Sequence, residues 1–128
     1  MPDDQIRLVL PADPAYGRVA RVAVQGLAGR LGLPARAVQD LRIAVDETLV
    51  LLLRPEGSAG EVTFTFTVTP DRLVIDAETT AGADQPWLDA GARTRFEALV
   101  ADTVDRHEVD DSGHHVHLEK ARPGRGAG

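Results

Sequence analysis

The stretch EVTFTFTVT, residues 61–69, alternates strictly between apolar side chains and threonines. Such a period of two is typical of a half-buried β-strand, in which successive side chains point to opposite faces. The apolar face carries Val62, Phe64, Phe66 and Val68. Pro70 and Asp71 then predict a turn, and residues 73–77 continue the alternation with Leu73, Ile75 and Ala77. We therefore expect a β-hairpin over residues 61–77.

Two helices are expected before this hairpin. Asp13 and Pro14 give an N-cap followed by a proline in the first turn, and Gly32 ends the helical pattern. The apolar face of this first helix is predicted to carry Tyr16, Val19, Ala20, Ala23, Leu27 and Leu31. Pro34 opens a second helix that runs to about residue 53. Its second half is apolar nearly all round, which predicts burial on most of its faces.

The remaining elements complete the order strand, helix, helix, strand, strand, helix, strand, strand. An opening strand is expected over residues 5–10, a polar loop over 79–87, a third helix between Leu88 and Thr103, and closing strands over 106–109 and 115–120. This order favours the α+β class, as a two-layer α/β sandwich with the helices packed on one face of a mainly antiparallel mixed sheet. We expect one domain over residues 1–120 and a disordered tail over 121–128, which reads ARPGRGAG.

Composition excludes several classes of protein. The 128 residues suffice for one domain, and the absence of cysteine rules out disulfides, thiolate catalysis and cysteine-ligated zinc. Lysine and arginine number 14 against 20 acidic residues, a net charge of -6, which argues against a general nucleic-acid-binding domain. No apolar run reaches the ~18 residues of a membrane span, and the start MPDDQ is no signal peptide. We expect a cytoplasmic protein without a membrane contact.

Glu47 is the first candidate for chemistry, because it lies in the middle of the most apolar helix. A carboxylate there needs a partner, solvent or a proton. One interpretation places Glu47 on a solvent stripe beside Asp46, or pairs it with Arg42 or Arg54. The other makes it a general base or a metal-shell carboxylate in a cleft.

A second candidate is the HHxH patch of His114, His115 and His117. In a strand, His115 and His117 share one face, so that two metal ligands are geometrically possible. No carboxylate or thiol at a ligand spacing completes such a site, which favours a solvated strand face and predicts no metal.

A third candidate is the outer stripe of the first helix, where Arg18, Arg21 and Gln25 recur at helical spacing. A basic stripe on an acidic protein is a solvated face or a docking strip for a protein partner.

The segment DLRIAVDE, residues 40–47, and the stretch ARVAV, residues 20–24, resemble the anti-sigma regulatory factors related to serine kinases. The resemblance extends over the chain up to residue 120. It implies the fold of the Bergerat-type (GHKL) ATPases, which is shared with the histidine kinases. In that family, an E-x-x-x-N box supplies a glutamate base and a magnesium-binding asparagine for bound ATP.

The nucleotide motifs implied by this resemblance are altered in three places. Glu47 matches the glutamate, but Leu51 stands at the asparagine position. In the D-x-G-x-G motif, Thr79 replaces the aspartate, and Ala81 and Ala83 replace the glycines. The glycine-rich lid is reduced to GAR at residues 91–93. Because leucine offers magnesium no oxygen ligand, we expect binding of ATP and magnesium to be weak or lost.

The resemblance implies an anti-sigma factor that sequesters an alternative sigma factor and is countered by a STAS-domain anti-anti-sigma protein. It implies partner contacts at Arg21, beside Arg18 and Gln25, and a homodimer. Two alternatives remain open at this point. One is an active ATP-dependent serine kinase of the anti-anti-sigma protein with Glu47 as its base, and the other is a dimeric adaptor module that binds no nucleotide.

Overall fold

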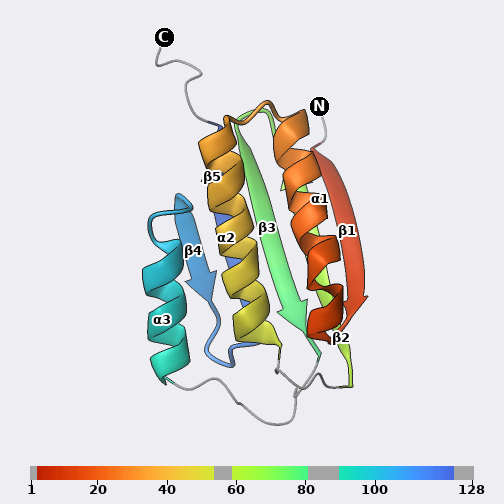
Figure 1. The fold of residues 1–128 in the computed structure, drawn as a ribbon, viewed down its shortest axis with the longest axis vertical. Coiled ribbons are helices and arrows are strands. Elements are labelled where there is room, and N and C mark those ends of the chain that lie inside the picture. Colours follow the sequence, from red (N-terminus) through yellow and green to blue (C-terminus); the bar gives the residue numbers. More distant parts are fainter. Residues whose placement is uncertain (1–2, 54–58, 81–89, 123–128) are drawn as a thin grey trace.

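The computed structural model describes residues 3–53, 59–80 and 90–122. Their elements follow the predicted order (Figure 1). In chain order they are β1 (Asp4–Pro11), a short 3-10 turn (Pro14–Tyr16), α1 (Gly17–Arg30), α2 (Ala35–Leu52), β2 (Glu61–Val68), β3 (Arg72–Thr79), α3 (Ala90–Val100), β4 (Arg106–Val109) and β5 (His115–Ala121). Asp13 accepts a hydrogen bond from the backbone N–H of Ala15, as its N-cap role predicts.

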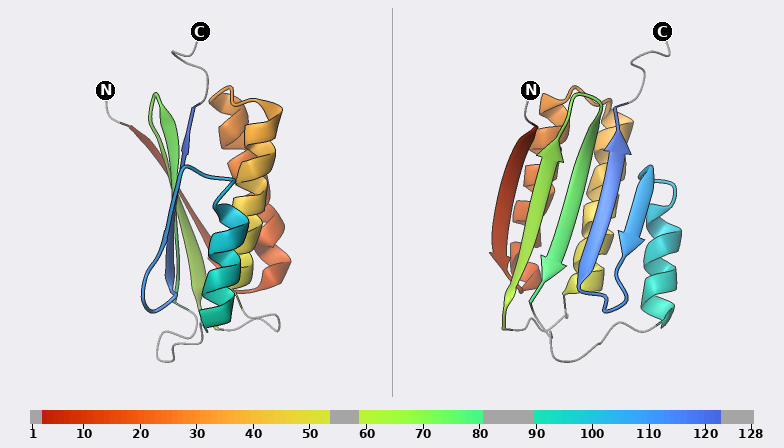
Figure 2. Two further views of the ribbon diagram at one scale, coloured as in Figure 1. Left: turned by 90° about the vertical axis from the view of Figure 1, so that its left-hand side faces the viewer. Right: turned by 180° about the vertical axis from the view of Figure 1, so that it is seen from behind.

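The strands form one sheet in the order β1-β2-β3-β5-β4 (Figure 2). All four pairings are antiparallel, so the sheet formed by the described residues is antiparallel throughout rather than mixed. The hairpin is confirmed, and its register places Phe66 opposite Ile75. In this register the apolar sides of both strands fall on one face of the sheet.

The helices cover that apolar face, and no helix of the described residues lies over the other one (Figure 2). The core between the two layers contains the fully buried rings of Phe64 and Phe66, whose centroids stack 5.9 Å apart. The open face carries the polar side chains of the same strands, such as Thr65 and Asp76. The α+β two-layer sandwich is thereby confirmed.

The buried face of α1 agrees only in part with the prediction: Ala20 and Leu31 are buried as expected, and Ala23 and Leu27 pack against the core. Tyr16 and Val19 are exposed, whereas the buried positions are Gly17, Ala20, Val24 and Ala28. The reason is close packing: a Cβ at Gly17 would lie 3.3 Å from the Cδ1 atom of Leu49. Small residues let α1 approach α2, while Val19 and Val22 remain on the outside.

The second helix is buried on most of its faces in its second half, as predicted, although Val50 is 59% exposed. Thr79 was expected in a loop but is the buried last residue of β3. At the other end, β5 extends to Ala121, one residue beyond the predicted strand, and the Arg122 N–H donates to the Asp71 carbonyl. Leu88 and residues 123–128 of the predicted tail lie outside the described residues. Among the described helices, none has the length and apolar character to cross a membrane.

Candidate functional site

The described positions that match the nucleotide motifs lie toward one end of the molecule. There, α2 and β3 finish and α3 begins (Figure 1). Three features of that end decide what it can do: the partner of Glu47, the packing of Leu51 and the environment of Thr79.

Glu47 is held by an arginine from a different helix. Its Oε1 atom accepts a hydrogen bond from the Nη1 atom of Arg95 on α3 at 2.9 Å. The Glu47 side chain is 17% exposed and that of Arg95 58% exposed, so the pair lies at the rim of the helix layer. The predicted pairing with Arg42 is wrong, because Arg42 donates to Gln39 instead. Arg54 lies outside the described residues.

Leu51 lies one helical turn beyond Glu47 and is only 4% exposed. It lines a hollow of about 180 Å³ together with Ala92 and Phe96 of α3. Phe96 is fully buried, so the contact between α2 and α3 below the Glu47–Arg95 pair is apolar. Ligand pockets typically have about 300–1,000 Å³. The hollow at Leu51 is smaller than that range.

Thr79 is tied into the sheet. Its backbone N–H donates to the carbonyl of His114 at 2.9 Å. The next residue, Thr80, returns to the start of β2, where its hydroxyl accepts a hydrogen bond from the Glu61 N–H at 2.9 Å. Ala81 and Ala83 lie outside the described residues.

The predicted lid remnant, residues 91–93, belongs to α3. Arg93 donates from its guanidinium to the carbonyls of Val109 and Asp110, which join β4 to the following turn. Through these contacts, Arg93 fixes α3 to the edge of the sheet.

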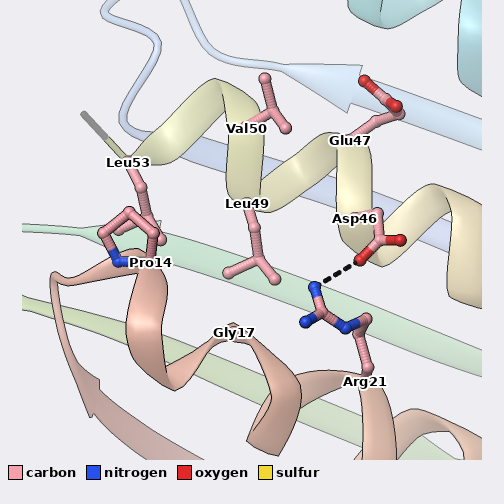
Figure 3. A pocket seen from close by; sticks show the side chains of 8 residues that line it. All are labelled: Pro14, Gly17, Arg21, Asp46, Glu47, Leu49, Val50 and Leu53. Carbon is pink, nitrogen blue, oxygen red and sulfur yellow. Dashed lines mark hydrogen bonds and ion pairs between the residues drawn. The ribbon is translucent and has the colours of Figure 1, made fainter. Parts of the chain in front are cut away.

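A larger groove of about 570 Å³ lies between α1 and α2, and Leu49, Val50 and Leu53 line its apolar side. Its polar end is the ion pair between Arg21 and Asp46, whose Nη1 and Oδ1 atoms are 2.8 Å apart (Figure 3). Glu47 points away from Arg21 in this view. Of the three residues predicted as a docking strip, Arg21 is therefore held by α2, whereas Arg18 and Gln25 are exposed.

The histidine patch forms a network of ion pairs on the open face of the sheet. Asp76 Oδ1 lies 3.1 Å from His115 Nε2 and 2.7 Å from His117 Nδ1. The other ring nitrogen of His117 lies 2.7 Å from Glu119 Oε2, and Glu119 also accepts a hydrogen bond from Arg72 at 2.8 Å. Within the described residues, no group of three histidines and carboxylates is arranged to hold a metal ion.

This network changes the proton affinities of two of its members. Partial burial acts to lower the pKa of His117, but hydrogen bonds to Glu119 and Asp76 and their negative charges outweigh it, so the pKa is raised. Hydrogen bonds from His117 and Arg72 hold the pKa of Glu119 below its ordinary value.

Curated relatives of this chain are named serine-protein kinase RsbW. The Bacillus subtilis (strain 168) protein is 34% identical over 97 residues, which is 71% of this chain and 61% of that protein. The Bacillus pumilus protein is 33% identical over 111 residues, 80% of this chain and 65% of that protein. For the Listeria monocytogenes EGD-e protein, the identity is 33% over 75 residues, 56% and 48% of the two chains. The chain is an RsbW-like protein.

These relatives confirm the resemblance to the serine-kinase type of anti-sigma factor. The RsbW-like chain spans between about half and two thirds of the length of the curated relatives it matches. No protein-family model matches it.

The described residues of the RsbW-like chain fit magnesium and ATP poorly. Magnesium prefers oxygen ligands, and the buried Leu51 side chain supplies none at the position of the box asparagine. The carboxylate of Glu47 is already engaged by Arg95. Sequence reasoning did not find Arg95 or Asp76, because their partners lie far along the chain and only the fold brings them together.

Proposed function

We propose that the chain is a regulator of the anti-sigma type that captures a sigma factor. A STAS-domain anti-anti-sigma protein counters it and releases the sigma factor. Binding of ATP by the chain is weak or lost. The observation that carries this proposal is the packing of Leu51 against α3, at the place where the family resemblance locates the nucleotide box. A scaffold that keeps its sandwich but fills its nucleotide box with apolar side chains is suited to binding proteins.

Calorimetry tests the loss of the nucleotide. Titration with ATP in the presence of magnesium should give no binding tighter than about 100 μM, which corresponds to roughly -5.5 kcal/mol. Binding tighter than that would contradict the proposal.

An active serine kinase is the second candidate, because the curated relatives carry that name and Glu47 remains partly accessible at the rim of the hollow. Transfer of labelled phosphate from ATP to a STAS-domain protein of the same organism separates the two functions. A transfer that disappears in Glu47→Gln would establish the kinase. Transfer that is equal in the parent chain and in Glu47→Gln would come from a contaminant.

Partner capture is tested by mixing the chain with the sigma factors of its organism. A complex should form with one of them, and Arg21→Glu should weaken it at least about tenfold, since a charge is reversed on α1. Arg42→Glu makes the same change in charge on the exposed side of α2 and serves as the matched control. A matching STAS-domain protein should displace the sigma factor. If the chain forms a complex with none of the sigma factors of its organism, this proposal is wrong.

The same proposal includes a homodimer, which is measured by light scattering during size-exclusion chromatography. A dimer mass supports it, and a monomer mass over the micromolar range contradicts it.

A further inference from the structure

The groove between α1 and α2 has the size and the lining of a small-molecule site. Its volume of about 570 Å³ lies within the range of about 300–1,000 Å³ that is typical of ligand pockets. On its apolar side, Leu49 and Leu53 are buried and Val50 is exposed. The charged side chains of the described lining lie together at the other end (Figure 3). A mostly apolar cavity with a few polar groups is the arrangement that small ligands use.

Gly17 keeps the two ends of this groove connected. A Cβ atom there would lie 3.3 Å from Leu49 Cδ1 and 3.5 Å from Arg21 Nη1, so a side chain would stand between the apolar side and the arginine. The φ angle of Gly17 is -58°, in the right-handed helical region, and its backbone does not require glycine. Besides letting the helices pack closely, the missing side chain therefore leaves the way from Leu49 to Arg21 open.

Arg21 has hydrogen-bonding capacity that the protein does not use. It donates to Asp46 through Nη1, and its other guanidinium nitrogens have no partner among the described residues. In Figure 3, the second terminal nitrogen is turned toward the side on which Gly17 lies. A guanidinium carries donors only, so the ligand group beside it is a hydrogen-bond acceptor.

Charge decides which acceptor fits this end of the groove. Asp46 neutralises Arg21, and the remaining charged residue of the described lining, Glu47, is acidic. The lining thus offers no net positive charge to a carboxylate. A ligand amine would bring further donors to the guanidinium. An uncharged carbonyl oxygen is the acceptor that meets both conditions.

We propose that the groove binds a small, uncharged acyl compound, an amide or an ester, whose carbonyl oxygen accepts a hydrogen bond from Arg21. Its alkyl chain lies along the apolar side of the groove. From Asp46 to Leu53 the helix rises about 10 Å, which is roughly the length of an extended chain of about eight carbon atoms. The inference goes beyond the proposed function, because it concerns a small molecule and not the capture of a protein.

Octanamide is the probe for this site. Octanoate and octylamine are its twins, since they have the same chain length but a charged end. Two-dimensional NMR of the isotope-labelled chain measures the three dissociation constants and shows which backbone amides respond. Octanamide should bind with a Kd of about 1 mM or below, at least about fivefold more tightly than either twin. The signals that shift should come from the parts of α1 and α2 that line the groove.

Two variants test the polar end of the groove. Arg21→Met should weaken octanamide and turn the preference toward octylamine, because Asp46 then lacks its cation. Arg42→Met is the matched control, since Arg42 is an exposed arginine of α2 outside the groove. Gly17→Ala should weaken octanamide at least about fivefold by narrowing the groove. Gly26→Ala should not, because a Cβ at Gly26 meets nothing within 4 Å.

A variant at the rim tests the apolar side. Val50→Glu changes an exposed side chain, so it should keep the fold even where Gly17→Ala does not, as circular dichroism would show. It places a carboxylate beside the alkyl chain and should weaken octanamide at least about fivefold. Val22→Glu is the matched control, because Val22 is as exposed as Val50 but does not line the groove.

Several results would overturn the proposal. These are no response to octanamide at about 1 mM, a twin that binds as tightly as octanamide, or an affinity that neither Arg21→Met nor Val50→Glu lowers. A second copy of the chain on the groove gives a different result. Light scattering would then show a dimer that Val50→Glu dissociates, and octanamide would produce no response; this outcome also overturns the proposal.

Discussion

The ring of His117 should make the stability of the protein fall as the pH rises above neutrality. Both of its nitrogens lie 2.7 Å from carboxylate oxygens, one of Asp76 and one of Glu119. A carboxylate only accepts hydrogen bonds, so both bonds form when both nitrogens carry protons and the ring is positive. Glu108 lies opposite His117 in the pairing of β4 with β5. The folded sheet therefore favours the charged ring.

The direction of the pH dependence follows from the raised pKa of His117. The stabilisation is fully present below the ordinary value of 6.5 and is lost as the pH rises through the higher pKa of the folded state. When the proton leaves, one charge-assisted hydrogen bond is lost and a lone pair faces a carboxylate. Hydrogen bonds to charged groups contribute about 1.5–3 kcal/mol, and the ring is 24% exposed, so we expect a loss of about 1–2 kcal/mol.

Urea unfolding followed by circular dichroism, at about pH 6 and about pH 9, measures this loss. His117→Gln keeps a hydrogen-bond donor but cannot be charged, so its free energy of unfolding should change less between the two pH values. His107→Gln is the matched control, because His107 has no hydrogen bond to a carboxylate within the described residues. The parent chain should exceed His117→Gln in free energy of unfolding by more at the lower pH than at the higher pH. An excess that is equal at both pH values, or larger at the higher pH, would refute the reasoning.

Three other substitutions have expected outcomes. Leu51→Asn should lower the free energy of unfolding by about 2–4 kcal/mol in a denaturant titration, because it places an amide in an apolar, buried position. Calorimetry should still detect no tight binding of ATP by this variant. Arg95→Ala should cost only about 0.2–1 kcal/mol by the same titration, since the Arg95 partner of Glu47 is well exposed. Lys120→Met should cost more, about 1–3 kcal/mol, because Lys120 is mostly buried and leaves Asp40 without its cation; a loss smaller than that of Arg95→Ala would contradict this ranking.

The strands could be predicted closely because a half-buried strand repeats every two residues, and this repeat depends on nothing beyond its own sequence. The alternation at residues 61–69 gives both the strand and its buried face. The face of α1 could not be predicted in the same way. There three of the four buried positions are small, at Gly17, Ala20 and Ala28, while Val22 is exposed. A pattern of apolar size therefore indicates the buried face only in part, because the helix packs closely through its small residues.

In the candidate site, the contacts that could not be predicted join residues that lie far apart in the sequence. Sequence reasoning could single out Glu47 as a carboxylate in an apolar helix, but its partner Arg95 lies 48 residues further along the chain. Nothing local to either residue indicates the pairing. Likewise, His115 and His117 were recognisable as neighbours on one strand face, whereas the aspartate that they share comes from β3.

The consecutive residues Asp46 and Glu47 connect α2 to two different helices. Successive positions on a helix are about 100° apart, so the two carboxylates point to different neighbours. Asp46 binds Arg21 of α1, and Glu47 binds Arg95 of α3. A general base must lie within hydrogen-bond reach of the proton that it takes from its substrate. In this chain Glu47 is occupied, and the residue one turn below it is apolar. In the described part of the chain, this pair of carboxylates therefore joins α2 to both of its neighbouring helices.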